Sequence, residues 1–241
     1  MFHRHVLALL ILLMLGLAAP ARADVVQLFT PAQLGPGLLM TDYPNLPAGV
    51  TAATISPPLV LNTGGVAVTF NTAVPAAAGG RLLRVNQGVG FLGDFPAGTE
   101  LLVTENGSGV PSGPLTITFG TPILEFGVSA QNTFFEAGQT STFTFSFFDG
   151  STLLETFVVS GPDTAGTFFL GGRAILGQQI TRVIISGAST INDPNLGVQN
   201  NFAIGPVSFR PVPEPATLIL LGTGLAGAAG VRWRRRRARH G

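Results

Sequence analysis

The side chains that most often carry acid–base or nucleophilic chemistry are almost absent from the middle of this 241-residue chain. Its three histidines, His3, His5 and His240, lie near the two ends, and the sequence contains neither cysteine nor lysine. Residues 24–210 therefore lack the groups needed for Ser-His-Asp or Cys-His hydrolysis, for Schiff-base chemistry, and for zinc or copper sites built from His or Cys. We predict that this region has no enzymatic activity.

Carboxylates are the remaining side chains with which residues 24–210 could act on a substrate or an ion. Eleven acidic residues lie in this region, and glycoside hydrolysis needs only two carboxyl groups roughly 5–10 Å apart. The sequence does not say which of the eleven face each other, so carboxylate-based glycoside hydrolysis stays open as an alternative. Asp149 and the turn at residues 192–195 offer oxygen ligands for calcium, but no regular calcium-loop spacing is present. We predict no cofactor, with structural calcium as the alternative.

Sugar binding by ring stacking has few candidates in this region. Residues 24–210 contain no Trp and a single Tyr, Tyr43, and most of the Phe residues alternate along predicted strands and are better explained as core. Recognition of a sugar through hydrogen bonds from Asn, Asp and Thr stays open.

The C-terminal thirty residues combine an extended proline segment, an apolar run and a basic tail. Pro213 and Pro215 favour extended geometry over Val212–Pro215, while Pro215 itself suits the first turn of a helix and Glu214 would lie near the positive end of its dipole. From Pro215 to Val231 the sequence has 17 residues without a charge. A helix of that length covers roughly 26 Å, slightly less than the hydrocarbon core of a bilayer. We predict a transmembrane helix over residues 216–231.

An arginine-rich tail, residues 232–241, follows the apolar run directly. By the positive-inside rule it holds this end of the chain in the cytoplasm and places everything before Pro213 on the other side of the membrane. Six residues form this predicted cytoplasmic retention tail: Arg232, Arg234, Arg235, Arg236, Arg237 and Arg239.

The run Val212-Pro213-Glu214-Pro215-Ala216-Thr217, with the apolar span and arginine cluster behind it, resembles the PEP-CTERM sorting signal of bacterial proteins that exosortase processes. The resemblance covers about 30 residues, 211–241. It implies a membrane-bound, transpeptidase-like partner that cuts near Pro-Glu-Pro and releases the outer part to the cell surface or extracellular matrix of a Gram-negative, exopolysaccharide-making bacterium. A permanent single-span anchor is the alternative.

The N-terminal residues predict a signal peptide over residues 1–23. Arg4 gives a positive start, residues 6–19 are apolar, and Ala21 and Ala23 have the spacing of a signal-peptidase site. Export through the Sec machinery follows, and a retained N-terminal anchor is the alternative. The protein is then expected to be held transiently in the inner membrane with its C-terminus in the cytoplasm, before release.

Between these two ends the charge balance is acidic, although the whole chain has a net charge of +1. Residues 24–210 contain five arginines and eleven acidic residues, a formal net charge of −6. Because no basic stripe exists outside the C-terminal tail, we predict no nucleic-acid partner.

Residues 24–210 show the short alternating runs and turn residues of an all-β domain. Period-2 alternation of apolar and polar residues predicts strands, and Asp149-Gly150 predicts a hairpin between two of them. We predict an antiparallel, jelly-roll-like β-sandwich whose core holds the Phe residues between 115 and 170, with residues 24–60 looser because of their prolines. The predicted strands cover residues 66–70, 100–104, 115–119, 123–128, 142–147, 153–159, 167–170, 180–185 and 202–209.

Blocks such as Phe91-Leu-Gly-Asp94-Phe95, Phe148-Asp149-Gly150 and Asn201-Phe202-Ala203-Ile204 also resemble a β-sandwich ectodomain common among PEP-CTERM surface proteins. That resemblance implies a surface role and no specific activity. We therefore predict a non-enzymatic, structural or adhesive component of an exopolysaccharide or biofilm matrix. The alternative is a carbohydrate-binding, lectin-like module that recognises the matrix polysaccharide.

Overall fold

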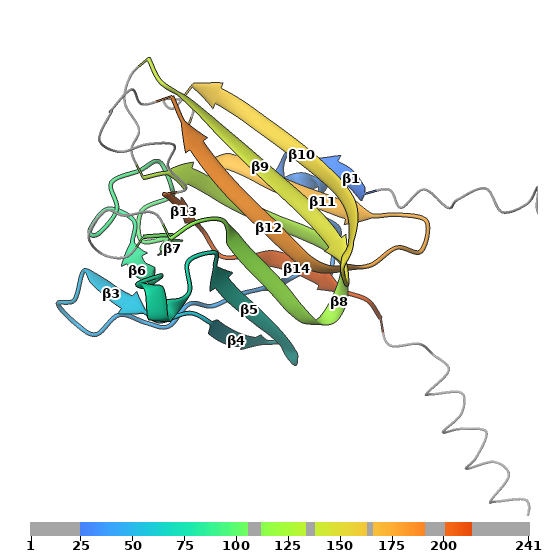
Figure 1. The fold of residues 1–241 in the computed structure, drawn as a ribbon, viewed down its shortest axis with the longest axis horizontal. Coiled ribbons are helices and arrows are strands. Elements are labelled where there is room, and N and C mark those ends of the chain that lie inside the picture. The colour runs from blue at the N-terminus through green and yellow to red at the C-terminus, as the bar shows by residue number, and fades with distance from the viewer. Residues whose placement is uncertain (1–24, 106–111, 134–137, 163–165, 191–200, 214–241) are drawn as a thin grey trace, which may run out of the picture. The chain divides into compact units, whose positions relative to one another are not determined.

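The computed structural model describes residues 25–105, 112–133, 138–162, 166–190 and 201–213. The chain divides into two compact units, Met1–Pro211 and Val212–Gly241, and nearly all of the described residues belong to the first. Apart from two short 3-10 turns, Pro31–Gln33 and Ala76–Ala78, the regular elements described in it are strands (Figure 1). Those strands are β1 (Val25–Leu28), β2 (Leu39–Met40), β3 (Ala52–Ile55), β4 (Leu59–Thr63), β5 (Val66–Thr72), β6 (Leu82–Asn86), β7 (Glu100–Val103), β8 (Leu115–Asn132), β9 (Thr140–Asp149), β10 (Thr152–Pro162), β11 (Phe168–Ala174), β12 (Ile180–Ser189), β13 (Phe202–Ile204) and β14 (Ser208–Pro211).

The predicted all-β, antiparallel fold is confirmed, and the long strand β8 organises it. The first part of β8 pairs with β12 and β5, whereas its second part pairs with β11, β14 and β13. One layer therefore runs β10-β9-β12-β8-β5-β4, and the strands paired with the end of β8 lie behind it in Figure 1. All pairings between these strands are antiparallel.

Local sequence chemistry explains the best-predicted part of this layer. Asp149-Gly150 joins β9 to β10, and Gly150 has a φ of 57°, which glycine adopts without steric cost. Along β9 the burial alternates strictly, so that Phe143, Phe145 and Phe147 point into the core.

The core between the layers is rich in phenylalanine, as predicted. The Phe126 ring on β8 meets the Phe147 ring on β9 edge to face, with centroids 5.9 Å apart, and Phe119 lies 5.3 Å from Phe209 on β14. A second, smaller cluster gathers Phe91 and Phe95 with Leu101 and Val103 of β7. These contacts bury the apolar faces of strands that are far apart in sequence, which is the main source of stability for a domain without disulfides.

Several predicted boundaries were wrong. Residues 115–119 and 123–128 belong to one continuous strand, β8, because its two parts find partners in different layers. The predicted strand over 202–209 is interrupted after Ile204, so that β13 and β14 are separate strands. Residues 24–60 contain the short strands β1, β2 and β3 and the start of β4, and the expectation that this segment is looser stays a prediction.

The predicted signal peptide (1–23), transmembrane helix (216–231) and arginine tail (232–241) lie outside the described residues. Within the ranges given above, no helix has both the length and the apolar character needed to cross a membrane.

Candidate functional site

Two of the predicted sorting residues, Val212 and Pro213, are described, and they follow strand β14 directly. The remaining predicted site residues fall outside the described ranges: Ala21, Ala23, Glu214, Pro215, Arg232, Arg234, Arg235, Arg236, Arg237 and Arg239. The structure thus shows how the domain ends before this motif.

Strand β14 is paired with neighbouring strands up to its last residue. Ser208 pairs with Gly127 and Arg210 pairs with Glu125 in the β8 ladder, while β2 pairs with the other edge of β14. One Arg210 Nη also donates to Glu125 Oε1 at 2.6 Å. Only Val212 therefore separates the paired strand from Pro213.

The Glu125 carboxylate is the centre of a buried ionic cluster next to this strand. It is fully buried, and it accepts hydrogen bonds from the Gly35 N–H at 2.7 Å, from Arg173 Nε at 2.7 Å and from Arg210. Burial alone would raise the pKa of this carboxyl, but the Gly35 amide and the two guanidinium groups together lower it. Glu125 is thus held ionised and has a structural role, which makes it unsuited to act as a general acid.

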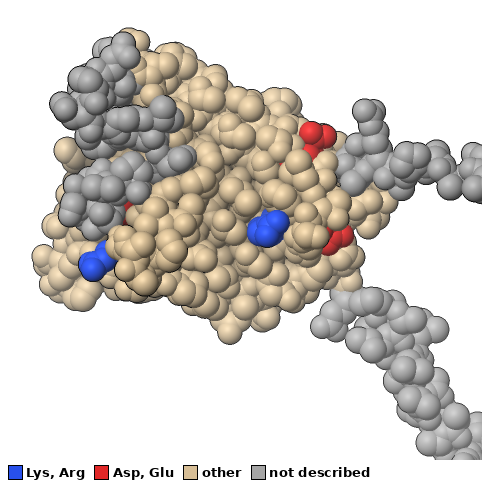
Figure 2. Space-filling view, viewed as in Figure 1, with Lys and Arg blue, Asp and Glu red and all other residues tan. Residues whose placement is uncertain are grey.

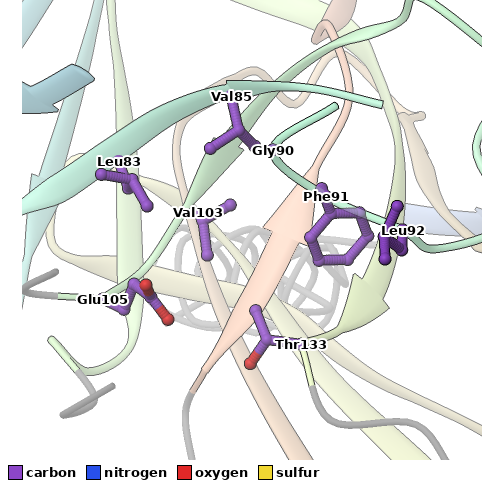
Figure 3. A pocket seen from close by; sticks show the side chains of 8 residues that line it. All are labelled: Leu83, Val85, Gly90, Phe91, Leu92, Val103, Glu105 and Thr133. Carbon is purple, nitrogen blue, oxygen red and sulfur yellow. The ribbon is translucent and has the colours of Figure 1, made fainter. Parts of the chain in front are cut away.

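A pocket of about 340 Å³ lies beside the smaller apolar cluster (Figure 3). Its wall is mostly apolar and comes from β6, the following loop, β7 with Glu105 beyond it, and Thr133 at the end of β8. Glu105 and Phe91 lie on opposite sides of it, with Val103 between them. The lining residues are Leu83, Val85, Gly90, Phe91, Leu92, Val103, Glu105 and Thr133.

Glu105 is the single titratable side chain among these lining residues. Burial raises the pKa of its carboxyl, and among the described residues it has no ionic partner. Glycoside hydrolysis needs two carboxyl groups, and the described lining residues contain one, Glu105. The pocket suits the binding of a small, partly apolar group.

Sequence reasoning missed this pocket. Its lining comes from four separated stretches of the chain, and Glu105 stands next to a Gly-containing segment that is typical of an ordinary turn. An acidic residue directly after an apolar strand was the one available signal, and such a residue is usually solvated.

The other acidic candidates are in different surroundings. Asp149 lies in the β9–β10 hairpin, while Glu100 forms an ion pair with the buried Arg84 at 2.5 Å. Asp94 Oδ2 accepts a hydrogen bond from the Gln131 amide at 2.7 Å. Across the part of the chain that the structure describes, no three acidic or histidine side chains gather as a metal site would require, and the turn at 192–195 lies outside it.

The side chains considered for sugar stacking are also placed. Tyr43 is buried, its hydroxyl donates to the Gly205 carbonyl at 2.9 Å, and burial raises its pKa far above the ordinary value. Tyr43 is therefore a core residue. Phe29, just after β1, is 66% exposed, and it offers the free ring that stacking on a sugar would require.

Comparison with known proteins identifies the kind of signal that the C-terminal segment carries. Residues 211–237 match the family model described as the PEP-CTERM protein-sorting motif. The chain carries a PEP-CTERM sorting signal. This signal implies export, sorting to the cell envelope and exosortase as the processing partner. It covers the final segment of the chain and assigns no activity to the β-rich domain.

The domain itself has distant structural neighbours. They include a DUF4465 family protein from Bacteroides ovatus (11% identity, 78% of this chain and 98% of that chain, TM-score 0.27) and a family 11 carbohydrate-binding module from Clostridium thermocellum in complex with a mixed-linked tetrasaccharide (11% identity, 73% and 97%, TM-score 0.25). A third is the enzymatically active domain of tailspike protein 4 from bacteriophage CBA120 (14% identity, 66% and 18%, TM-score 0.21). No curated protein matches the chain. At these TM-scores the likenesses carry no functional argument.

Proposed function

We propose that this is a non-enzymatic exported protein that exosortase cuts at the Pro-Glu-Pro motif, leaving the β-rich domain as a structural or adhesive component of an exopolysaccharide or biofilm matrix. The observation that supports it most directly is the sorting signal at 211–237. In this proposal a Sec-dependent signal peptide, cut by signal peptidase after Ala23, brings the domain across the inner membrane. The span at 216–231 and its arginine tail then hold the precursor until it is processed.

The domain has the properties that such a role needs. Aromatic rings pack against one another in its core, and it has no disulfide that could be reduced. The carboxylates of Glu100 and Glu125 form ion pairs with arginines. The lack of His, Cys and Lys over residues 24–210 supports a role without catalysis.

The test is the intact mass of the protein recovered from the native cell surface or medium, compared with a strain that lacks exosortase. A mass ending near Pro213–Pro215 in the wild type, with the full tail retained in the mutant membrane, is the expected result. A Glu214→Ala variant should keep its tail in both strains, whereas a Glu155→Gln variant should be processed normally. An intact tail in the wild type would contradict the proposal and favour the permanent anchor.

Two observations favour a second candidate, a carbohydrate-binding module for the matrix polysaccharide. The domain has a pocket of about 340 Å³ with one carboxyl, and an exposed Phe29 ring elsewhere on its surface. Binding to an array of bacterial polysaccharides tests this candidate, and the absence of binding to every matrix glycan would contradict it.

A further inference from the structure

The outward side of the layer β10-β9-β12-β8-β5 carries hydroxyl groups in register across its strands. On β9, Thr144 lies between Ser186 of β12 and Val158 of β10, and Ser146 lies opposite Thr156. We call this surface the hydroxyl face, and its hydroxyl-bearing residues are Thr69, Thr116, Thr118, Thr142, Thr144, Ser146, Thr156, Ser160 and Ser186. Neighbouring strands stand about 4.8 Å apart, and alternate residues along a strand about 6.7 Å, so the groups form a regular grid.

Some of these hydroxyls are already ordered by each other. Thr142 and Ser160 share a hydrogen bond of 2.7 Å between β9 and β10, and Ser146 and Thr156 share one of 2.8 Å. A hydroxyl that takes part in such a pair keeps a further lone pair for a ligand. These four hydroxyls are therefore oriented before anything binds.

The hydroxyl face carries one charge, although the domain as a whole is acidic. At the outward positions of its five strands the charged side chain is Arg182 of β12, and none of these positions holds a carboxylate. Figure 2 shows this side of the molecule as a broad uncharged surface over β9, β12 and β8, with a basic patch near its middle and acidic groups at one margin.

Arg182 contacts an aromatic ring and has no acidic partner among the described residues. Its guanidinium carbon lies 4.3 Å from the centre of the Phe148 ring, the neighbouring residue on β9. Among the described residues, none of the three ion pairs involves Arg182, and its Nε is buried without a hydrogen-bond partner. A guanidinium placed over a ring keeps its Nη donors, which can bind a carboxylate through two parallel hydrogen bonds.

We propose that the hydroxyl face binds a carboxylate-bearing polysaccharide. Arg182 pairs with the carboxylate of a uronic-acid unit, and the surrounding Thr and Ser hydroxyls exchange hydrogen bonds with the sugar hydroxyls on either side. This inference rests on the second candidate above, the carbohydrate-binding module, and it adds the hydroxyl face as the surface that binds the polymer.

Other occupants fit these observations less well. In a two-fold dimer the hydroxyl face would pack against the same face of a second copy. Because that face has a cation and no carboxylate, Arg182 would gain no acidic partner. Nucleic acids and anionic membranes are bound by clusters of basic residues, and this face has one. On this face a single cation, Arg182, is surrounded by hydroxyl groups. A polysaccharide whose carboxylates are separated by sugar hydroxyls has the complementary pattern.

The experiment is calorimetric titration of the full-length protein in detergent with polygalacturonate oligosaccharides. The methyl ester of the same oligosaccharides, which keeps the backbone and lacks the charge, is the comparison ligand. We expect binding to polygalacturonate that weakens with salt, and at least tenfold weaker binding to the ester. Arg182→Gln should weaken binding to polygalacturonate by tenfold or more, whereas Arg81→Gln, which removes an exposed arginine elsewhere, should leave it unchanged. Thr144→Val keeps the side-chain shape, and we expect it to cost about threefold to tenfold.

Equal binding by wild type and Arg182→Gln would overturn the proposal, provided that both variants unfold at the same temperature. So would an absence of binding by the wild type. If the wild type does not bind but is processed at Pro-Glu-Pro and recovered from the matrix, this inference fails while the proposed surface role stands. If it binds but keeps its tail in the native membrane, the sorting proposal fails and the binding face stands.

Discussion

Replacing Glu125 with glutamine tests how much the buried ionic cluster contributes to the fold. The substitution keeps the size of the side chain and an oxygen for the Gly35 N–H, and it removes the charge that Arg173 and Arg210 share. Because these three partners come from the N-terminal segment, β11 and β14, the change loosens three parts of the chain at once.

The magnitude follows from the exposure of the partners. Breaking a fully buried ion pair costs about 3–5 kcal/mol, because the partner charge is left without water or counter-ion. Here the side chains of Arg173 and Arg210 are 38% and 33% exposed, so that water solvates them once the carboxylate is gone. We therefore expect Glu125→Gln to lower the free energy of unfolding by about 2 kcal/mol. For a domain of this size that corresponds to a fall in melting temperature of about 4–8 °C.

The assay is urea unfolding of the full-length protein in detergent, followed by circular dichroism at several pH values. The folded-state pKa of Glu125 is lowered, so its stabilising effect is complete above the unfolded-state value, near pH 4.5, and is lost as the pH falls through the lower folded-state pKa. The gap between wild type and Glu125→Gln should therefore be present at pH 7 and close in strong acid. Glu155→Gln, which removes an acid without an ion pair among the described residues, should change stability by less than about 0.5 kcal/mol. Equal urea midpoints for Glu125→Gln and wild type at pH 7 would refute the reasoning.

Three further changes probe the core and the pocket. Phe147→Ala should cost about 3–5 kcal/mol of unfolding free energy in the same urea assay, because the ring is fully buried among other aromatic rings; a loss below 1 kcal/mol would mean that the site repacks. Gly172→Ala should cost about 1–3 kcal/mol, since a Cβ there would lie 2.5 Å from Phe147 Cζ, and an unchanged midpoint would show that the ring can move. Glu105→Gln should raise stability at pH 7, because burial raises the pKa of this carboxyl and so opposes its ionisation. The gain in stability should vanish as the pH falls below about 4.5. A gain that persists in acid would point to a different cause.

The features that the sequence predicted well depend on neighbours along the chain. The β9–β10 hairpin follows from Asp149-Gly150 and from the alternation of residues 142–147, both of which are local signals. The sorting signal is likewise a linear motif, so its residues could be recognised without any fold.

The features that escaped prediction depend on partners far away in sequence. Glu125 meets Arg173, Arg210 and Gly35 across 48, 85 and 90 residues, and no periodicity within β8 reveals these contacts. The sequence also did not predict that β8 is one continuous strand, for a related reason. Gly120 and Pro122 are typical strand breakers, but a strand that changes layer at that point has no ladder partner there to lose.

The β14 ladder has a mechanical consequence. An extended chain advances about 3.3–3.6 Å per residue, so Pro213 lies within roughly 7 Å of the last paired residue, Pro211. Anything joined to the new C-terminus after processing would therefore pull on β14 with almost no slack. Force applied along the strand would act in shear on the hydrogen bonds to β8 and on the Arg210–Glu125 pair together, instead of opening the ladder one bond at a time. A domain fixed in this way can transmit tension from a surface attachment directly into its core sheet.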